Sequence, residues 1–94
     1  MTAKIFIPVK YIGEGLFSSQ RVVELTDYQR KTFQGLFDEV HMSGNSLLKV
    51  QVMSENEKLV ALTVPHGEHC GLYGHGEDAG RNITIERSRL VYMN

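Results

Sequence analysis

The sequence predicts an α+β fold in which one helix packs across a mostly antiparallel sheet of about five strands. Residues 3–11, 47–53, 58–64 and 82–92 alternate apolar and polar side chains, which is the period of a strand. Residues 26–41 instead carry apolar side chains three to five positions apart, which is typical of a helix. A chain of 94 residues cannot bury two separate cores, so we expect one domain spanning residues 1–94 in the order β-β-α-β-β-loop-β.

The first two strands are predicted to form a hairpin with a wide loop. In residues 3–11 the alternation places four apolar residues on one face, namely Ile5, Ile7, Val9 and Tyr11. Pro8 has no amide proton, so this strand is expected to lie at an edge or to be interrupted there. Glycines at 13 and 15 break the pattern, and residues 20–25 read as a second, shorter strand.

The predicted helix begins at Thr26 or Asp27, either of which is a suitable N-cap, and Gln29 fits a capping box. It is expected to end near His41 or at Gly44. Gly35 weakens a helix, so we interpret its presence as a sign of close packing against the sheet. The apolar stripe of this helix would be core and consists of Tyr28, Phe33, Leu36, Phe37 and Val40.

A second hairpin follows, with strands at 47–53 and 58–64 and a turn at residues 54–57. In the last strand, 82–92, Ile83 and Ile85 share one face whereas Leu90 and Tyr92 fall on the other. This change of phase predicts a bulge or bend near Ser88, or a strand that leaves the sheet.

The segment 65–80 is the candidate functional region. It contains three of the four histidines, the only cysteine and five of the nine glycines of the chain. Loops of this length without secondary structure are uncommon in compact domains and tend to be functional or disordered.

Recognition of a partner or small ligand is the main hypothesis for this loop. Glycine-rich backbone leaves amides free to hold an anion, and the arginines that follow bind phosphate well. Tyr73 or His75 would stack on the base of a nucleotide-like ligand, while Leu72 and Tyr73 have the composition of a protein-binding loop. The predicted ligand- or partner-binding residues are His66, His69, Leu72, Tyr73, His75, Arg81, Arg87 and Arg89.

Two chemical alternatives use the same loop. Zinc, structural or catalytic, would be held by His66, His69, Cys70 and His75, although adjacent residues 69 and 70 diverge in most backbone conformations and no paired cysteine knuckle is present. Cys70 as a nucleophile, with a neighbouring histidine as base, is the other alternative. Neither matches a specific motif, so we expect no catalytic residues and no cofactor, with zinc as the alternative.

Composition limits the partners. Ten Lys and Arg residues against eleven Asp and Glu residues give a formal charge of −1, so no overall field attracts nucleic acid or a membrane. The single cysteine, and the lack of a long apolar run or leader, predict a cytoplasmic protein. The small core favours a homo-oligomer.

Together these features predict a small non-enzymatic binding or inhibitory protein that acts stoichiometrically. Its target would be a host protein or a small anionic, nucleotide-like ligand. Compact neutral domains of this kind are common among accessory proteins of phages and mobile elements, so an inhibitor of a host factor, such as a host-defence antagonist of viral origin, is one hypothesis.

Overall fold

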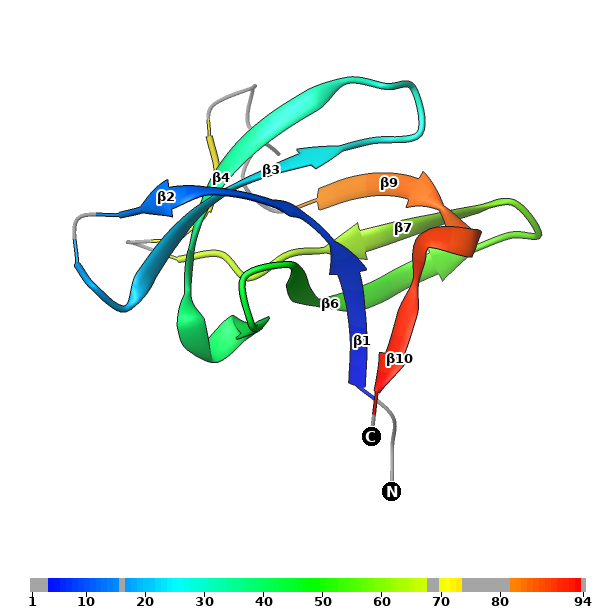
Figure 1. The fold of residues 1–94 in the computed structure, drawn as a ribbon. Coiled ribbons are helices and arrows are strands. Elements are labelled where there is room, and N and C mark those ends of the chain that lie inside the picture. Colours follow the sequence, from blue (N-terminus) through cyan, green and yellow to red (C-terminus); the bar gives the residue numbers. More distant parts are fainter. Residues whose placement is uncertain (1–3, 16, 68–69, 74–81, 94) are drawn as a thin grey trace.

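The computed structural model describes residues 4–15, 17–67, 70–73 and 82–93, and it is built of two antiparallel sheets (Figure 1). The predicted α+β class is wrong, because the described residues contain no α-helix. Their only helical segments are two 3₁₀ turns, η1 (Glu39–His41) and η2 (Arg87–Arg89).

The first sheet has six strands. Its members are β1 (Lys4–Pro8), β5 (Met42–Ser43), β6 (Leu47–Glu55), β7 (Leu59–Thr63), β9 (Asn82–Glu86) and β10 (Val91–Met93). They are ordered β10-β1-β6-β7-β9, with β5 also paired to β6. The second sheet is ordered β2-β3-β4-β8 and consists of β2 (Lys10–Glu14), β3 (Gln20–Thr26), β4 (Thr32–Asp38) and β8 (Gly71–Leu72).

The segment predicted as a helix forms the β3–β4 hairpin instead. The Asp27 carboxylate accepts hydrogen bonds from the backbone N–H groups of Gln29 (2.9 Å) and Lys31 (2.8 Å), which fixes a tight turn where the helix was expected to begin. Arg30 completes the reversal with a φ of 69°. Residues four apart, such as Phe33 and Phe37, lie on the same face of a helix and also on the same face of a strand. Their spacing therefore did not distinguish a helix from a strand.

Pro8 marks the point where the chain passes from one sheet to the other. The expectation of an edge strand is wrong, because β1 lies between β10 and β6. The expectation of an interruption is confirmed: β1 ends at Pro8, two residues beyond Phe6, the last residue to pair with β10. The chain then continues through Val9 into β2.

The second predicted hairpin is confirmed as β6–β7, with a turn shorter than expected because β6 extends to Glu55. The Asn56 side chain stabilises that turn by accepting hydrogen bonds from the N–H groups of Lys58 and Leu59, both at 2.8 Å. The predicted break near Ser88 is also confirmed, since η2 separates β9 from β10 there.

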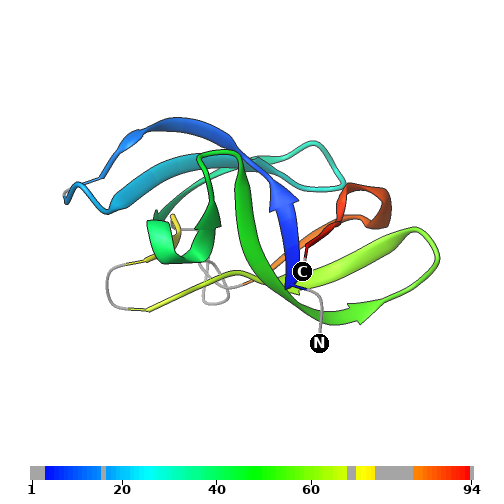
Figure 2. The same cartoon turned by 60° about the horizontal axis from the view of Figure 1, so that its bottom comes forward.

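The short connection between β9 and β10 requires the first sheet to be strongly curved. β9 and β10 are its two outer strands, yet only η2 and Leu90 separate them along the chain. Five strands in a flat sheet would hold the outer two roughly 19 Å apart at about 4.8 Å per neighbour. The sheet must therefore bend, and Figures 1 and 2 show this curvature.

The core lies between the two sheets, because both contribute to one cluster of buried side chains. Phe37 and Val23 of the second sheet, for example, are fully buried, as are Leu48 and Ile85 of the first. The remaining members of the cluster are Ile7, Leu25, Val50, Val60, Leu62, Val64, Leu72 and Ile83.

Candidate functional site

Residues 71–73 of the 65–80 loop lie against the second sheet, whereas Pro65 and His66 lie beside β6 of the first sheet. The N–H of Gly67 donates to the carbonyl of Cys70 (3.0 Å), and β8 pairs with β4. Three of the predicted site residues, His69, His75 and Arg81, lie outside the described residues.

Leu72 and Tyr73 occupy different environments although they are adjacent. Leu72 is 9% exposed and belongs to the core cluster, so little of its surface is available to a partner. Tyr73 is 50% exposed, and its N–H donates to the carbonyl of Gln34 (2.8 Å). Of these two predicted binding residues, Tyr73 is therefore the accessible one.

The arginines of η2 make contacts within the chain. The Arg89 guanidinium donates to the carbonyl of Thr26 (2.6 Å) and to the Glu86 carboxylate (3.3 Å), which ties η2 to the end of β3. Arg87 forms an ion pair with Glu55 at 3.5 Å, and both side chains are nearly half exposed. Arg89 is thus a structural link, and Arg87 keeps more of its surface open to solvent.

Cys70 is a weak nucleophile in this setting. Burial raises the pKa of its thiol, and the negative charge of Asp38 raises it further. Less of the reactive thiolate is present at neutral pH as a result.

The metal alternative rests on four side chains, of which only His66 and Cys70 are described. Within the described part of the chain, no group of three or more His, Cys, Asp or Glu side chains is placed to hold a metal ion.

An open groove of about 520 Å³ lies between η1, β6 and the segment that follows β7. Of the predicted site residues that the structure describes, only His66 lines it. The other polar lining residues are His41, Lys49, Gln51 and Thr63, and the apolar ones are Val50, Val64 and Pro65.

Strand alternation explains how these polar residues reach the groove. In β6, Leu48 and Val50 face the core, so the intervening Lys49 and the following Gln51 face outward. The hairpin register then places Thr63 of β7 directly opposite Gln51. Two strands thus present polar side chains on the same outer surface.

The two histidines of the lining differ in the surroundings of their ring nitrogens. Nδ1 of His66 lies 3.1 Å from the carbonyl oxygen of Val64. A carbonyl only accepts hydrogen bonds, so Nδ1 carries the proton and Nε2 remains free for other contacts. Nδ1 of His41 is buried without a hydrogen-bond partner, which is an unfavourable state for a polar atom.

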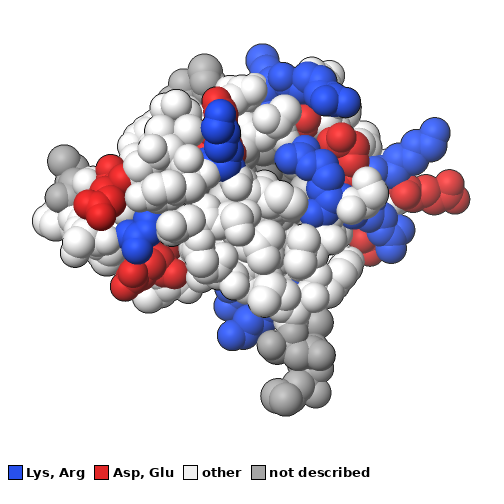
Figure 3. Space-filling view, in the orientation of Figure 1, with Lys and Arg blue, Asp and Glu red and all other residues white. Residues whose placement is uncertain are grey.

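The described residues that line the groove include a positively charged side chain but no negatively charged one. Lys49 is cationic, and none of the lining residues in the described part of the chain is acidic. Elsewhere, on the face shown in Figure 3, basic and acidic side chains are interspersed. The described lining of the groove therefore carries a positive charge although the whole chain is nearly neutral.

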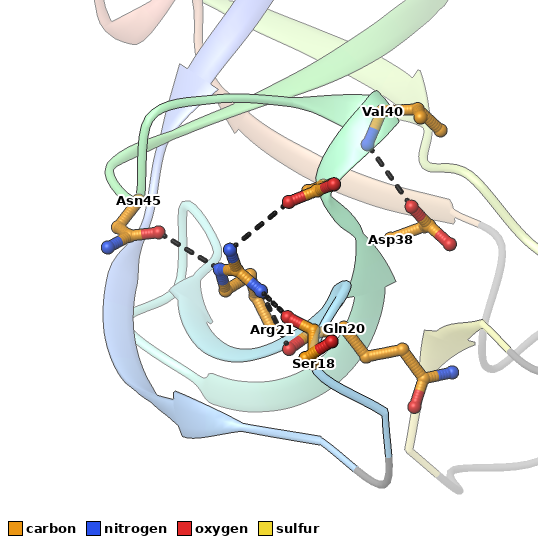
Figure 4. A network of polar contacts seen from close by, with 7 residues as sticks. Ser18, Gln20, Arg21, Asp38, Val40 and Asn45 are labelled. Carbon is orange, nitrogen blue, oxygen red and sulfur yellow. Dashed lines mark hydrogen bonds and ion pairs between the residues drawn. The ribbon is translucent and has the colours of Figure 1, made fainter.

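A polar network around Arg21 holds η1, which carries His41, in place (Figure 4). The Arg21 guanidinium donates to the Ser18 carbonyl (2.6 Å), to Asn45 Oδ1 (3.2 Å) and to the Glu39 carboxylate (3.3 Å). The N–H of Glu39 also donates to the carbonyl of Ser19 at 2.7 Å. One side chain of β3 thereby fixes both the turn before β6 and the first residue of η1.

Sequence reasoning missed four of the five polar residues of the groove. Alternation in 47–53 and 58–64 already indicated that Lys49, Gln51 and Thr63 face away from the core. Their convergence depends on the hairpin register and on the position of η1. His41 was assigned to the end of a helix and given no role, because the strand–turn–strand path that brings it to β6 was not foreseen.

Comparisons with known protein families, curated proteins and solved structures found no match. The helical segments of the described residues are too short and too polar to cross a bilayer. The fold and the groove are therefore the basis for assigning a function.

Proposed function

We propose that this protein is a small, non-enzymatic binding protein that sequesters a small anionic ligand in the groove between η1, β6 and the end of β7. Phosphate esters, including nucleotide-like molecules, are the ligand class. The observation that carries the proposal is the lining itself, in which Lys49, His41 and His66 converge and no acidic side chain is found among the residues that the structure describes.

The hydrogen-bonding groups of the groove support this ligand class. Lys49 supplies three N–H donors and Gln51 adds a side-chain amide, while the Thr63 hydroxyl donates to Asn82 Oδ1 at 3.4 Å. Donors of this kind satisfy the several acceptor oxygens of a phosphate, and ionised partners strengthen such bonds.

The size of the groove supports a ligand larger than a simple ion. Small-molecule sites usually enclose roughly 300–1,000 Å³, and about 520 Å³ lies in that range. Pro65 is the apolar lining residue that is not buried, and it offers a surface for a non-polar portion of the ligand. A phosphate ester with a base or another ring combines the two kinds of surface.

Stoichiometric binding rather than turnover is part of the proposal. The only cysteine has a raised pKa, which supports a role other than nucleophile for Cys70. The ligand would be withheld from its normal user in the cytoplasm, which makes the protein an inhibitor by sequestration.

The first prediction concerns thermal stability with ligands. Pyrophosphate and nucleoside mono- and diphosphates are added to the protein, and the melting temperature Tm is measured. A ligand at about 100 times its Kd stabilises the folded state by about 2.7 kcal/mol, which raises Tm by roughly 10 °C in a domain of this size. We expect at least one member of the panel to do so.

Charge-neutralising variants locate the effect. Lys49→Met is expected to abolish the shift, because it removes the fixed positive charge of the groove. Lys58→Met makes the same change at the far end of the β6–β7 hairpin and is expected to keep the shift. No shift with any phosphate ligand, or equal loss in both variants, would contradict the proposal, and a shift with zinc alone would favour the metal alternative.

A further inference from the structure

Two hairpin turns and η2 meet at one end of the molecule and form a continuous surface. The Arg89 guanidinium donates to the carbonyl of Thr26, at the start of the β3–β4 turn, at 2.6 Å. On its other side, η2 contacts the β6–β7 turn, where the N–H of Arg87 donates to the carbonyl of Lys58 at 2.8 Å. Figures 1 and 2 show these segments at the same end. We call this region the basic surface; it comprises residues 27–31, 55–58 and 86–89.

The acidic side chains of the basic surface are largely engaged within the chain. They are Asp27, Glu55, Glu57 and Glu86. Glu55 and Glu86 form ion pairs with the two arginines of η2, at 3.5 and 3.3 Å. The Asp27 carboxylate accepts hydrogen bonds from two backbone N–H groups of its own turn. Of the four, Glu57 alone takes part in no ion pair or hydrogen bond found in the described part of the chain.

The basic side chains of this surface are more numerous and less engaged. Five of the ten Lys and Arg residues of the chain lie here. Arg30, Lys31 and Lys58 are exposed and belong to none of the ion pairs found among the described residues. Figure 3 shows basic side chains gathered at this end, with acidic ones between them. The side chains without an internal partner therefore have an excess of positive charge.

Arg30 occupies a position that the backbone gives no reason to fill with arginine. Its φ of 69° lies in the left-handed region, which glycine and asparagine adopt at lower cost. A conformation of this kind, kept without a local reason, points to a role for the side chain. Tyr28 of the same turn is 41% exposed, and tyrosine and arginine are the residue types enriched at binding hot spots.

The β3–β4 turn holds these side chains in a fixed arrangement. The N–H of Asp27 donates to the carbonyl of Lys31 (2.9 Å), and the N–H of Arg30 donates to the carbonyl of Asp27 (3.1 Å). The N–H of Tyr28 donates to the carbonyl of Thr84 in β9 (2.9 Å), which attaches the turn to the first sheet. A surface that is already ordered loses little conformational entropy when it binds a partner.

We propose that the basic surface binds an acidic peptide segment of a partner protein, rich in Asp and Glu. The carboxylates of this segment pair with Arg30, Lys31 and Lys58, and the ring of Tyr28 supplies an apolar contact beside them. Charge favours such a segment over nucleic acid. A nucleic-acid strand carries a phosphate at every nucleotide, and it is disfavoured by a chain with a formal charge of −1 and four acidic residues on this surface.

This proposal does not rest on the proposed function of the groove. The groove is formed by η1, β6 and the segment after β7, and none of its lining residues belongs to the basic surface. Lys49→Met is therefore expected to retain peptide binding. Substitutions in the β3–β4 turn are expected to retain the rise in Tm with a phosphate ligand, so failure of one proposal is distinguishable from failure of the other.

Fluorescence anisotropy with a labelled peptide of alternating glutamate and alanine residues tests the proposal. At low ionic strength we expect a saturable rise in anisotropy that weakens as salt is added, because exposed charges are screened. A peptide of alternating lysine and alanine is expected to give no rise. An oligothymidylate strand of the same length is expected to bind more weakly than the glutamate peptide.

Two double variants locate the binding site. Arg30→Gly with Lys31→Gln removes two charges, and glycine suits the φ at position 30, so the turn is retained. This variant is expected to bind the glutamate peptide about tenfold more weakly, from the loss of two exposed ion pairs. Lys4→Gln with Lys10→Gln removes the same net charge from exposed positions of β1 and β2 and is expected to bind as the unmodified protein does. Tm values confirm that both variants are folded.

Three results would overturn the proposal. The first is the absence of saturable binding to the glutamate peptide at low ionic strength. The second is an equal loss of affinity in the two double variants, which would show a general effect of charge. The third is tighter binding of oligothymidylate than of the peptide, which would identify nucleic acid as the partner class instead.

Discussion

Gly35 shows how a single residue position depends on the strand that contains it. A Cβ atom at this position would lie 2.5 Å from the ring of Phe37 and 3.1 Å from the carbonyl oxygen of Gly71. Phe37 is fully buried, so its ring has little room to move. The sequence predicted that Gly35 lies in a helix and packs closely against a sheet. Gly35 instead lies in strand β4, and its close contacts are with Phe37 of the same strand and Gly71 of β8.

Gly35→Ala is therefore expected to lower the free energy of unfolding by about 1–3 kcal/mol, the usual cost of overpacking a core. Denaturant unfolding measures the change. Gly13→Ala is the control, since nothing lies within 4 Å of a Cβ there, and it is expected to change stability by less than about 0.5 kcal/mol. Equal effects of the two substitutions would show that the Phe37 contact is not the cause.

The environment of Cys70 predicts slow alkylation. Burial, followed by the charge of Asp38, raises the pKa of the thiol, so at any pH below that value less thiolate is present than in an unfolded peptide. Iodoacetamide should react with the folded protein more slowly than with the urea-unfolded protein at the same mildly alkaline pH.

Asp38→Asn is expected to speed the reaction, because it removes the negative charge while keeping a side-chain oxygen that accepts from the N–H of Val40. A thiol that reacts faster in the folded protein than in the unfolded one would contradict this description and would reopen the catalytic alternative.

At the scale of elements, the strands β6, β7 and β9 were predictable from the sequence, whereas only the first strand of the hairpin at residues 20–38 was. Alternation identified β6, β7 and β9 because their buried residues occupy every second position. The β3–β4 turn depends on Asp27, whose side chain suits a helix N-cap and a tight turn equally. Packing of β4 between β3 and β8 decided between them, and that contact is not visible in the local sequence.

The Arg21 network is the element-scale contact that defines the groove, because it fixes η1 and hence His41. Arg21→Ala is expected to destabilise the protein by about 1–2 kcal/mol, a value limited by the exposure of Glu39. It should also weaken ligand binding. Arg87→Ala removes an arginine with one exposed ion pair and is expected to change stability by less than about 0.5 kcal/mol.

Denaturant unfolding and ligand titration of both variants check this expectation. If Arg21→Ala left stability and ligand affinity unchanged, η1 would be held by other contacts, and the network would have no role in shaping the groove.

At the scale of the whole molecule, the first sheet is curved and the chain passes from it into the second sheet after β1. Two separate features of the surface result. One is the groove on the outer side of β6 and β7, and the other is the basic surface formed by the β3–β4 turn, η2 and the β6–β7 turn. The sequence directed attention to the 65–80 loop because reactive residue types are concentrated there. Of the predicted binding residues that the structure describes, the groove takes only His66, because its other described polar residues come from elements distant in sequence and converge only in the folded chain.

The most direct test of the proposed groove is an NMR titration of the ¹⁵N-labelled protein with the phosphate ligand that gives the largest rise in Tm, or with pyrophosphate if none does. The amide signals of His41, Lys49, Gln51, Thr63 and His66 are predicted to shift together along one saturable binding curve, with those of β2 unaffected. Absence of saturable shifts, or shifts centred on residues 70–73 and η2 instead, would contradict the assignment of this groove as the ligand site.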